Sequence, residues 1–176
     1  MKLSPLQVAR YQYSPKLPGM LRNGISDICV CSGGATESVA DQEKIKALFP
    51  NTYGKKEITF QKGANTSVAK KQVVGVILSG GQAPGGHNVI CGLYDALKAT
   101  NPENVLYGFK GGPDGLLKND YVVFDDAFID AYRNTGGFDI IGSGRTKLET
   151  KEQFAIVAEN AKQNGLTAVS YTHLRA

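Results

Sequence analysis

The sequence has few metal-binding side chains and no long hydrophobic segment. Its 176 residues include only two histidines and three cysteines. Cys29 and Cys31 have no second Cys or His pair at metal-binding spacing, so we expect reduced thiols and no metal site within this chain. No apolar run reaches the length of a membrane span, and no signal segment begins the chain. We therefore expect a cytoplasmic protein without a membrane partner.

The charge is also small and lacks a pattern. The chain has 20 Lys and Arg residues against 16 Asp and Glu residues, a net charge of +4. The basic residues form pairs, such as Lys55-Lys56 and Lys70-Lys71, and no stripe interleaved with aromatic residues. A nucleic-acid partner is therefore not expected. The apolar content of 41% is ordinary for a globular protein and is enough for one α/β domain or part of a larger protein.

One stretch carries the clearest structural signal. Residues 73–79 are an apolar run rich in β-branched residues, which predicts a strand buried on both faces. Residues 80–88 then hold four glycines and a proline, and an amphipathic helical pattern follows from Val89. A strand, a glycine-rich turn and a helix in this order predict a phosphate cradle, since backbone N–H groups converge at the helix start.

Strands alternate with helices along the rest of the chain. We expect helices at 5–10, 42–49, 86–99, 125–132 and 150–164, and strands at 28–31, 57–60, 73–79, 104–108, 138–141 and 166–169. This alternation predicts an α/β fold with a Rossmann-like parallel sheet and flanking helices, after an irregular N-terminal extension. We expect the extension to span 1–70 and the α/β domain to span 71–169. Ligands of such sheets bind beyond the carboxyl ends of the strands.

The glycine-rich turn has the spacing of a Walker loop without its key side chains. Gly81 and Gly86 are correctly spaced, but His87 replaces the lysine and Asn88 replaces the serine or threonine. An ordinary P-loop NTPase is therefore not expected, although the backbone can still bind phosphate. A tight turn without a ligand remains the alternative, and His87 can either contact a ligand or pack internally.

A second polar loop is expected at a neighbouring strand end. Residues 142–147 hold two glycines, Arg145 and Lys147. Arg145 can bind phosphoryl oxygens with two N–H groups, and Lys147 can add a point charge. A solvated surface loop is the alternative. Lys110 and Asp114, in another glycine-rich turn, are explained mostly by turn chemistry.

Three segments together resemble a known family. Residues 78–88 are similar to the first phosphate-binding motif of the phosphofructokinases, with Gln82 and His87 in the form of the long pyrophosphate-dependent branch. Residues 136–150 resemble the second motif of that branch, and residues 41–54 resemble its N-terminal extension. The similarity runs from about residue 4 to Val169.

The resemblance implies a glycolytic transferase that moves a phosphoryl group from pyrophosphate to the 1-hydroxyl of fructose 6-phosphate. It implies that Gly80 and Gly81 bind the phosphoryl donor. It also implies that Arg145 is catalytic, bridging donor and acceptor where charge develops, and that Lys147 is a second donor contact. Magnesium would neutralise the pyrophosphate, and the full-length protein would be a homo-oligomer.

The end of the chain departs from the family pattern. A Gly-Gly-Asp-Asp-Ser motif, which would hold the magnesium, is expected after Val169, but residues 170–176 have another sequence. We expect these seven residues to be foreign, the isolated chain to be inactive, and its open sheet edge to make it poorly soluble. An ATP-dependent phosphofructokinase and a non-catalytic regulatory subunit remain alternatives.

Overall fold

The computed structural model describes residues 3–24, 27–63 and 70–174. The chain divides into two compact units, one of Lys16–Val68 and one that joins Met1–Pro15 to Ala69–Ala176. Residues 64–69, which precede the central strand, lie outside the described residues. None of the helices in the described ranges is long and apolar enough to cross a membrane. The domain boundaries expected at 70 and 169 stay predictions.

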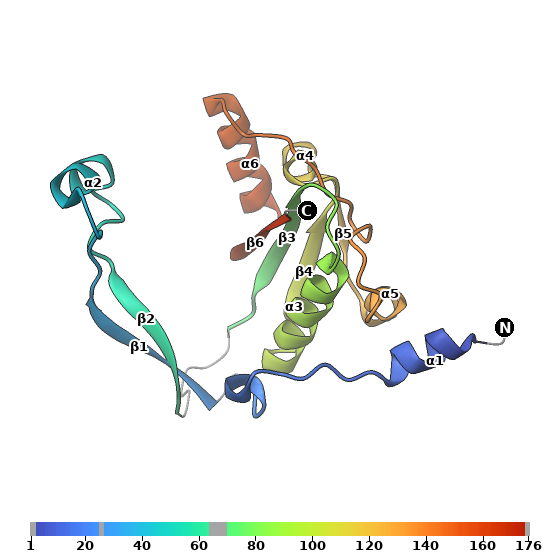
Figure 1. The fold of residues 1–176 in the computed structure, drawn as a ribbon. Coiled ribbons are helices and arrows are strands. Elements are labelled where there is room, and N and C mark those ends of the chain that lie inside the picture. Colours follow the sequence, from blue (N-terminus) through green and yellow to red (C-terminus); the bar gives the residue numbers. More distant parts are fainter. Residues whose placement is uncertain (1–2, 25–26, 64–69, 175–176) are drawn as a thin grey trace. The chain divides into compact units, whose positions relative to one another are not determined.

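A four-stranded sheet forms the centre of the α/β unit, with the strand order β5-β4-β3-β6 (Figure 1). The central strand β3 (Val73–Gly80) pairs in parallel with β4 (Val105–Phe109) on one side and with β6 (Ala168–Leu174) on the other. The edge strand β5 (Tyr121–Val123) is antiparallel to β4. The expected α/β fold is confirmed, with an antiparallel edge that was not predicted.

Helices cover both faces of this sheet. α3 (Gly86–Thr100) and α5 (Asp126–Tyr132) pack on one face (Figure 1). α4 (Pro113–Lys118) and α6 (Lys151–Gln163) pack on the other. The short α4 was not predicted, because its Pro-Asp-Gly sequence has the composition of a turn.

The side chains of β3 alternate between the two cores. Val76 and Leu78 are buried in the core beneath α3, whereas Ile77 packs with Phe109 and Leu116 on the opposite face. This alternation explains why β3 is apolar throughout, since a strand covered on both faces has no solvent side. The prediction of a fully buried strand is confirmed.

Local capping signals fix two helix starts. Thr150 and Gln153 form a capping box at the start of α6, where a helix was expected. A second capping box, between Ser4 and Gln7, begins α1 (Pro5–Gln12). The side-chain amide of Asn134 donates to the carbonyl groups at the end of α1, which ties this helix to the α/β unit.

The other unit is built on a hairpin. β1 (Ile28–Ala35) pairs antiparallel with β2 (Lys56–Lys62), and between them lies α2 (Gln42–Leu48). A short 3-10 helix, η1 (Gly19–Leu21), precedes β1. β1 runs past residue 31, where the strand was expected to end, because pairing with β2 continues across an irregularity before Ala35.

The prediction of a strand at 138–141 is wrong. These residues form turns and bends, and the loop 142–147 therefore does not follow a strand. Their backbone groups bond outside any ladder: the Ile140 N–H donates to His87 Nε2, and the Ile141 carbonyl accepts from the Gly111 N–H. Ile140 and Ile141 are apolar because they fill the core beneath α3, and periodicity alone cannot distinguish this from a short strand.

Two glycines of α3 provide a test of this packing. A Cβ on Gly86 would lie 2.9 Å from Leu78 Cδ1 and 3.2 Å from Phe138 Cα, whereas a Cβ on Gly92 would meet nothing within 4 Å. We expect Gly86→Ala to lower the free energy of unfolding by about 1–3 kcal/mol through overpacking. Gly92→Ala should raise it by about 0.5–1 kcal/mol, because alanine favours the helix. Denaturant unfolding measures both, and equal effects would contradict the packing.

Candidate functional site

The glycine-rich turn lies at the carboxyl end of β3. The turn begins at Gly80 with a φ of 105° and ends at Gly85 with a φ of 101°. Glycine adopts such positive values freely, whereas other residues do so at a cost, so the turn depends on both positions. Gly85 is the N-cap of α3 and offers no side-chain cap. The first N–H groups of α3 therefore need other partners.

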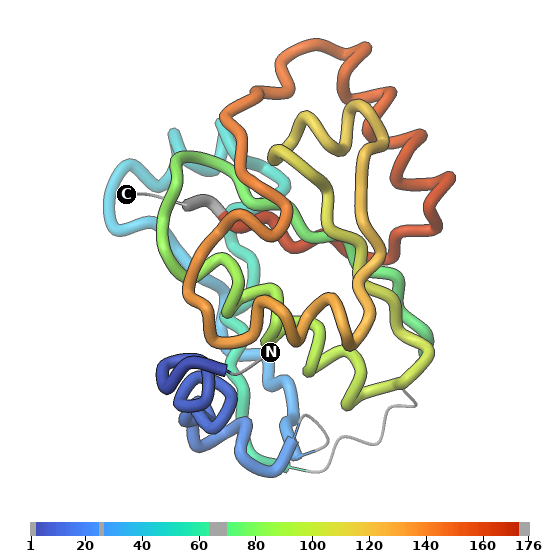
Figure 2. Tube along the Cα trace, turned by 90° about the vertical axis from the view of Figure 1, so that its right-hand side faces the viewer, coloured from blue at the N-terminus to red at the C-terminus, as the bar shows by residue number. Residues whose placement is uncertain are grey.

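One irregular segment supplies those partners. Three N–H groups in and after the turn donate to carbonyl groups of residues 136–144, which Figure 2 shows in orange near the green turn. The pairs are Gly80 with Gly144 (2.9 Å), Gly85 with Gly136 (2.7 Å) and His87 with Gly137 (2.9 Å). These N–H groups are thus already bonded within the protein, which limits the backbone donors that an anion can use.

The same segment brings Arg145 to the turn. Gly144 forms an isolated parallel bridge with Ser79, the penultimate residue of β3. The guanidinium of Arg145 then lies over Gly81, where a Cβ would be only 2.9 Å from Nη2. Two predicted site residues, Gly81 and Arg145, are therefore in direct proximity, although they come from distant parts of the chain.

Arg145 is exposed and lacks a carboxylate partner among the residues that the structure describes. Three other cations of this unit are neutralised in ion pairs. The pairs are Arg133 with Asp95 (2.7 Å) and Asp130 (3.0 Å), Lys110 with Asp120 (2.9 Å), and Lys118 with Asp114 (2.6 Å). Lys147 is likewise exposed and unpaired within the described residues. The turn therefore faces a positive group whose hydrogen-bond donors are available to an anion.

His87 is packed inside the protein. Its side chain is buried, with the residue only 3% exposed, and its ring contacts the Tyr132 ring edge-on at 4.9 Å. Nδ1 lies 2.5 Å from Thr135 Oγ1, and Nε2 accepts from the Ile140 N–H at 3.1 Å. Of the two roles that the sequence left open for His87, the structure supports internal packing.

The hydrogen-bond network assigns the tautomer of His87. The Thr135 hydroxyl has one proton, which it donates to the Tyr132 carbonyl at 2.5 Å, so its oxygen accepts from His87 Nδ1–H. Nε2 then carries the lone pair that accepts from Ile140. Asp139 Oδ1 also lies 2.8 Å from Nε2, but its side chain is 76% exposed and can rotate into solvent. The buried amide of Ile140 cannot, so the neutral ring fits the fixed partners better.

Burial lowers the pKa of His87 below its ordinary value of 6.5, and the opposing effect of Asp139 is smaller. Burial likewise raises the pKa of the Cys91 thiol, which lies one turn further along α3. Both shifts favour neutral side chains in this core.

One contact near the turn had no signal in the sequence. The Tyr171 hydroxyl donates to Ser79 Oγ at 2.7 Å, across the β3–β6 pair. Thr135, the partner of His87, was also not singled out, because an isolated threonine in a loop has no distinguishing pattern. Both contacts join residues far apart in sequence, so only the fold could reveal them.

The described residues do not by themselves form a magnesium site. Within those ranges, the structure brings together no group of three or more His, Cys, Asp or Glu side chains that could hold a metal ion. A magnesium ion prefers several oxygen ligands in octahedral geometry. The groups that this chain offers to an anion are therefore the cations Arg145 and Lys147 and the backbone N–H groups of the turn.

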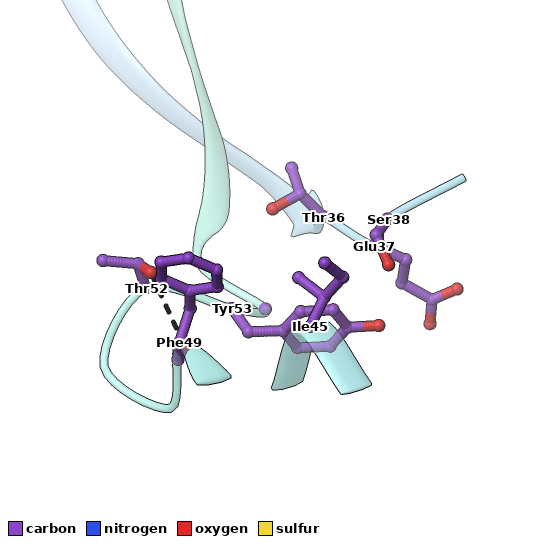
Figure 3. A pocket seen from close by; sticks show the side chains of 8 residues that line it. Thr36, Glu37, Ser38, Ile45, Phe49, Thr52 and Tyr53 are labelled. Atoms are coloured by element: carbon purple, nitrogen blue, oxygen red, sulfur yellow. Dashed lines mark hydrogen bonds between the residues drawn. The ribbon is translucent and has the colours of Figure 1, made fainter. Parts of the chain in front are cut away.

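A separate hollow lies in the hairpin unit (Figure 3). It has a volume of about 250 Å³ and is lined by Thr36, Glu37, Ser38, Ile45, Phe49, Thr52, Tyr53 and Gly54. Ser38 Oγ is buried without a hydrogen-bond partner in the described structure. No residue predicted to act in phosphoryl transfer lines this hollow.

Comparison with known proteins shows which proteins this chain resembles in sequence. No protein-family profile matches it. It is 48% identical over 169 residues to the pyrophosphate–fructose 6-phosphate 1-phosphotransferase of Porphyromonas gingivalis, covering 96% of the chain and 30% of that protein. It is 43% identical over 178 residues to the protein of the same name from Treponema pallidum, covering 96% of the chain and 31% of that protein.

A solved structure agrees with the fold. The pyrophosphate-dependent phosphofructokinase of Nitrosospira multiformis matches 58% of this chain and 26% of its own chain, with a TM-score of 0.51 and 22% sequence identity. At this identity the match supports the fold alone.

These findings show that the chain is homologous to the phosphofructokinases. Within that family, the curated relatives reported above are the pyrophosphate-dependent enzymes, which confirms the resemblance seen in the motifs. The chain spans about 30% of the length of these relatives.

The buried histidine predicts a specific pH dependence of stability. Because the pKa of His87 is lowered in the fold, the unfolded chain takes up a proton first as the pH falls below 6.5. The free energy of unfolding should therefore fall between pH 6.5 and the lower pKa of the folded state, and the full stability is present above that window. In His87→Gln this pH-dependent part of the free energy of unfolding should disappear. Denaturant unfolding between about pH 7.5 and about pH 5 measures the difference, and parallel curves for the two proteins would contradict it.

Proposed function

We propose that the natural protein carrying this chain transfers a phosphoryl group from pyrophosphate to fructose 6-phosphate, and that this chain supplies the phosphoryl-donor side of the site. The names of the relatives in Porphyromonas gingivalis and Treponema pallidum support the activity. The single observation that carries the proposal is the guanidinium of Arg145 beside Gly81, at the carboxyl end of β3, with no carboxylate partner among the described residues. This is where ligands of parallel sheets bind.

Arg145 is suited to the proposed role by its chemistry. Its guanidinium has five N–H donors in a fixed plane and keeps its charge at every relevant pH. Phosphoryl transfer depends mainly on positioning and on stabilising the charge of the transferring group. We assign Arg145 the catalytic role of holding the bridging and non-bridging oxygens as that charge develops, and Lys147 the role of a second donor contact.

The backbone contribution follows from the hydrogen bonds of the turn. The Gly80 N–H already donates to Gly144, so Gly80 acts by shaping the turn at its positive φ. We assign the backbone contact with pyrophosphate to the N–H groups of residues 81–83. Gly81 has a further role, because a larger residue would occupy the space of the Arg145 guanidinium.

Other properties remain proposals that rest on the family. We propose that pyrophosphate binds as its magnesium complex, since the ion would offset its charge. A cytoplasmic location, assembly as a homo-oligomer and a place in glycolysis are proposed on the same ground. The alternatives are an enzyme that uses ATP as the donor and a non-catalytic subunit. An activity measurement with pyrophosphate and with ATP distinguishes both from the proposed enzyme.

Replacing Arg145 tests the proposal directly. In the natural protein, Arg145→Lys should lower kcat with pyrophosphate by about 100-fold or more, because an ammonium cannot reproduce the two-point contact. Arg22→Lys, on the hairpin unit, is the matched control and should leave kcat unchanged. The assay follows fructose 1,6-bisphosphate formation with magnesium and either pyrophosphate or ATP. Turnover with ATP alone, or none with either donor, would overturn the proposed donor or the proposed catalysis.

Replacing Gly81 tests the proximity of Arg145. A Cβ at this position would lie 2.9 Å from Nη2, at the flexible end of the arginine, so Gly81→Ala should displace Arg145 and leave the fold intact. We expect the KM for pyrophosphate to rise by about 10-fold or more, from the lost alignment. The melting temperature should stay within a few degrees of the parent, as for Gly34→Ala, where a Cβ would meet nothing within 4 Å. An unchanged KM would contradict the arrangement.

A further inference from the structure

Arg145 follows a segment that has no regular secondary structure. Residues 135–143 form neither helix nor strand, so no hydrogen-bond ladder fixes their path. The segment is nevertheless attached at defined points to the start of α3 and to the end of β3, and the Gly111 N–H donates to the Ile141 carbonyl between them. These attachments must decide where Arg145 lies.

The first attachment is His87, which holds the segment by both its backbone and its side chain. Its N–H donates to the Gly137 carbonyl at 2.9 Å, its Nε2 accepts from the Ile140 N–H at 3.1 Å, and its Nδ1 bonds Thr135. One residue in the first turn of α3 therefore fixes three points of a six-residue stretch.

The fit around the ring is close. A Cβ on Gly137 would lie 2.6 Å from His87 Cε1, so the segment can approach the imidazole only because this position is glycine. On another side the Tyr132 ring contacts the imidazole edge-on. Gly137 and Tyr132 therefore confine the imidazole ring, and the ring in turn fixes the path of the segment.

The second attachment lies immediately before Arg145. The Gly144 carbonyl accepts from the Gly80 N–H at 2.9 Å, and the Gly144 N–H donates to the Leu78 carbonyl at 3.4 Å. Only four residues separate Ile140 from Arg145, so a shift at the first attachment must move or loosen the second.

We propose that His87 is a positioning residue, which sets the place of Arg145 over the donor turn by holding residues 135–140 against α3. This inference rests on the proposed function for the role of Arg145 in phosphoryl transfer. His87 stands at the position of the Walker lysine but acts in another way. The lysine of a Walker loop binds phosphate itself, whereas His87 holds the segment that carries the phosphate-binding Arg145.

The chemistry of imidazole explains why histidine suits this place. A neutral imidazole offers a donor and an acceptor on opposite sides of a flat ring, which matches the Thr135 oxygen and the Ile140 N–H. An apolar residue would leave the buried Ile140 N–H unpaired and would remove the contact with the Thr135 oxygen. Glutamine has a donor and an acceptor as well, so it is the conservative replacement.

A double-mutant cycle in the natural protein tests the inference. The proteins are the parent, His87→Phe, Arg145→Lys, the double variant, and His87→Gln as the conservative control. We expect His87→Phe to lower kcat/KM for pyrophosphate by about 10- to 100-fold and leave KM for fructose 6-phosphate unchanged, because Arg145 is misplaced. His87→Gln should recover most of the loss. In the Arg145→Lys background His87→Phe should cost less than about 3-fold, since the two residues act as a unit.

Independent effects of the two substitutions would overturn the inference, as would parent-like kinetics of His87→Phe after correction for its folded fraction. Thr135→Val removes the Nδ1 partner and replaces His87→Phe if that variant does not fold; it should give a smaller loss of the same kind. Hydrogen exchange of residues 137–145 supplies a readout that needs no activity. Faster exchange in His87→Phe supports the inference even if the parent lacks pyrophosphate activity, which would refute only the proposed function, and unchanged exchange would overturn it.

Discussion

The buried imidazole of His87 is the contact on which the geometry of the site depends. It bonds an amide, Ile140, that lies 53 residues away in sequence, and a hydroxyl, Thr135, that lies 48 residues away. Each bond joins α3 to the segment 135–143, which has no hydrogen-bond ladder of a helix or sheet to fix its path. The Ile140 amide is buried and needs an acceptor, which the neutral ring provides at Nε2. Burial of the ring lowers the pKa of His87 and so favours the same neutral form.

The second constraint on the site is the distribution of charge. Several cations of the α/β unit are held by carboxylates, as Arg133 is by Asp95 and Asp130. Arg145 lies at the carboxyl end of β3 and has no such partner among the described residues. An anion can therefore use its donors without breaking an ion pair. The glycines of the turn contribute space and shape, since the N–H groups of Gly80 and Gly85 at its two ends are bonded to the neighbouring segment.

Much of the fold could be predicted because its signals are local. The apolar run of β3, the amphipathic pattern of α3 and the capping box of α6 each depend on residues within a few positions of one another. The expected strand at 138–141 was wrong because burial produces the same apolar pattern with or without a strand. The edge strand β5 and the short α4 were missed, since both are too brief to give a period.

The sequence by itself determined the order of strand, glycine-rich turn and helix, the absence of a Walker lysine, and the motifs that resemble the phosphofructokinases. Only the tertiary structure decided that His87 is an internal residue, that the Gly80 N–H is bonded to Gly144, and that Arg145 lies over Gly81. The physical reason is the range of the interactions. Turn and helix preferences act between neighbours in the chain, whereas these three arrangements require segments more than 45 residues apart to pack together.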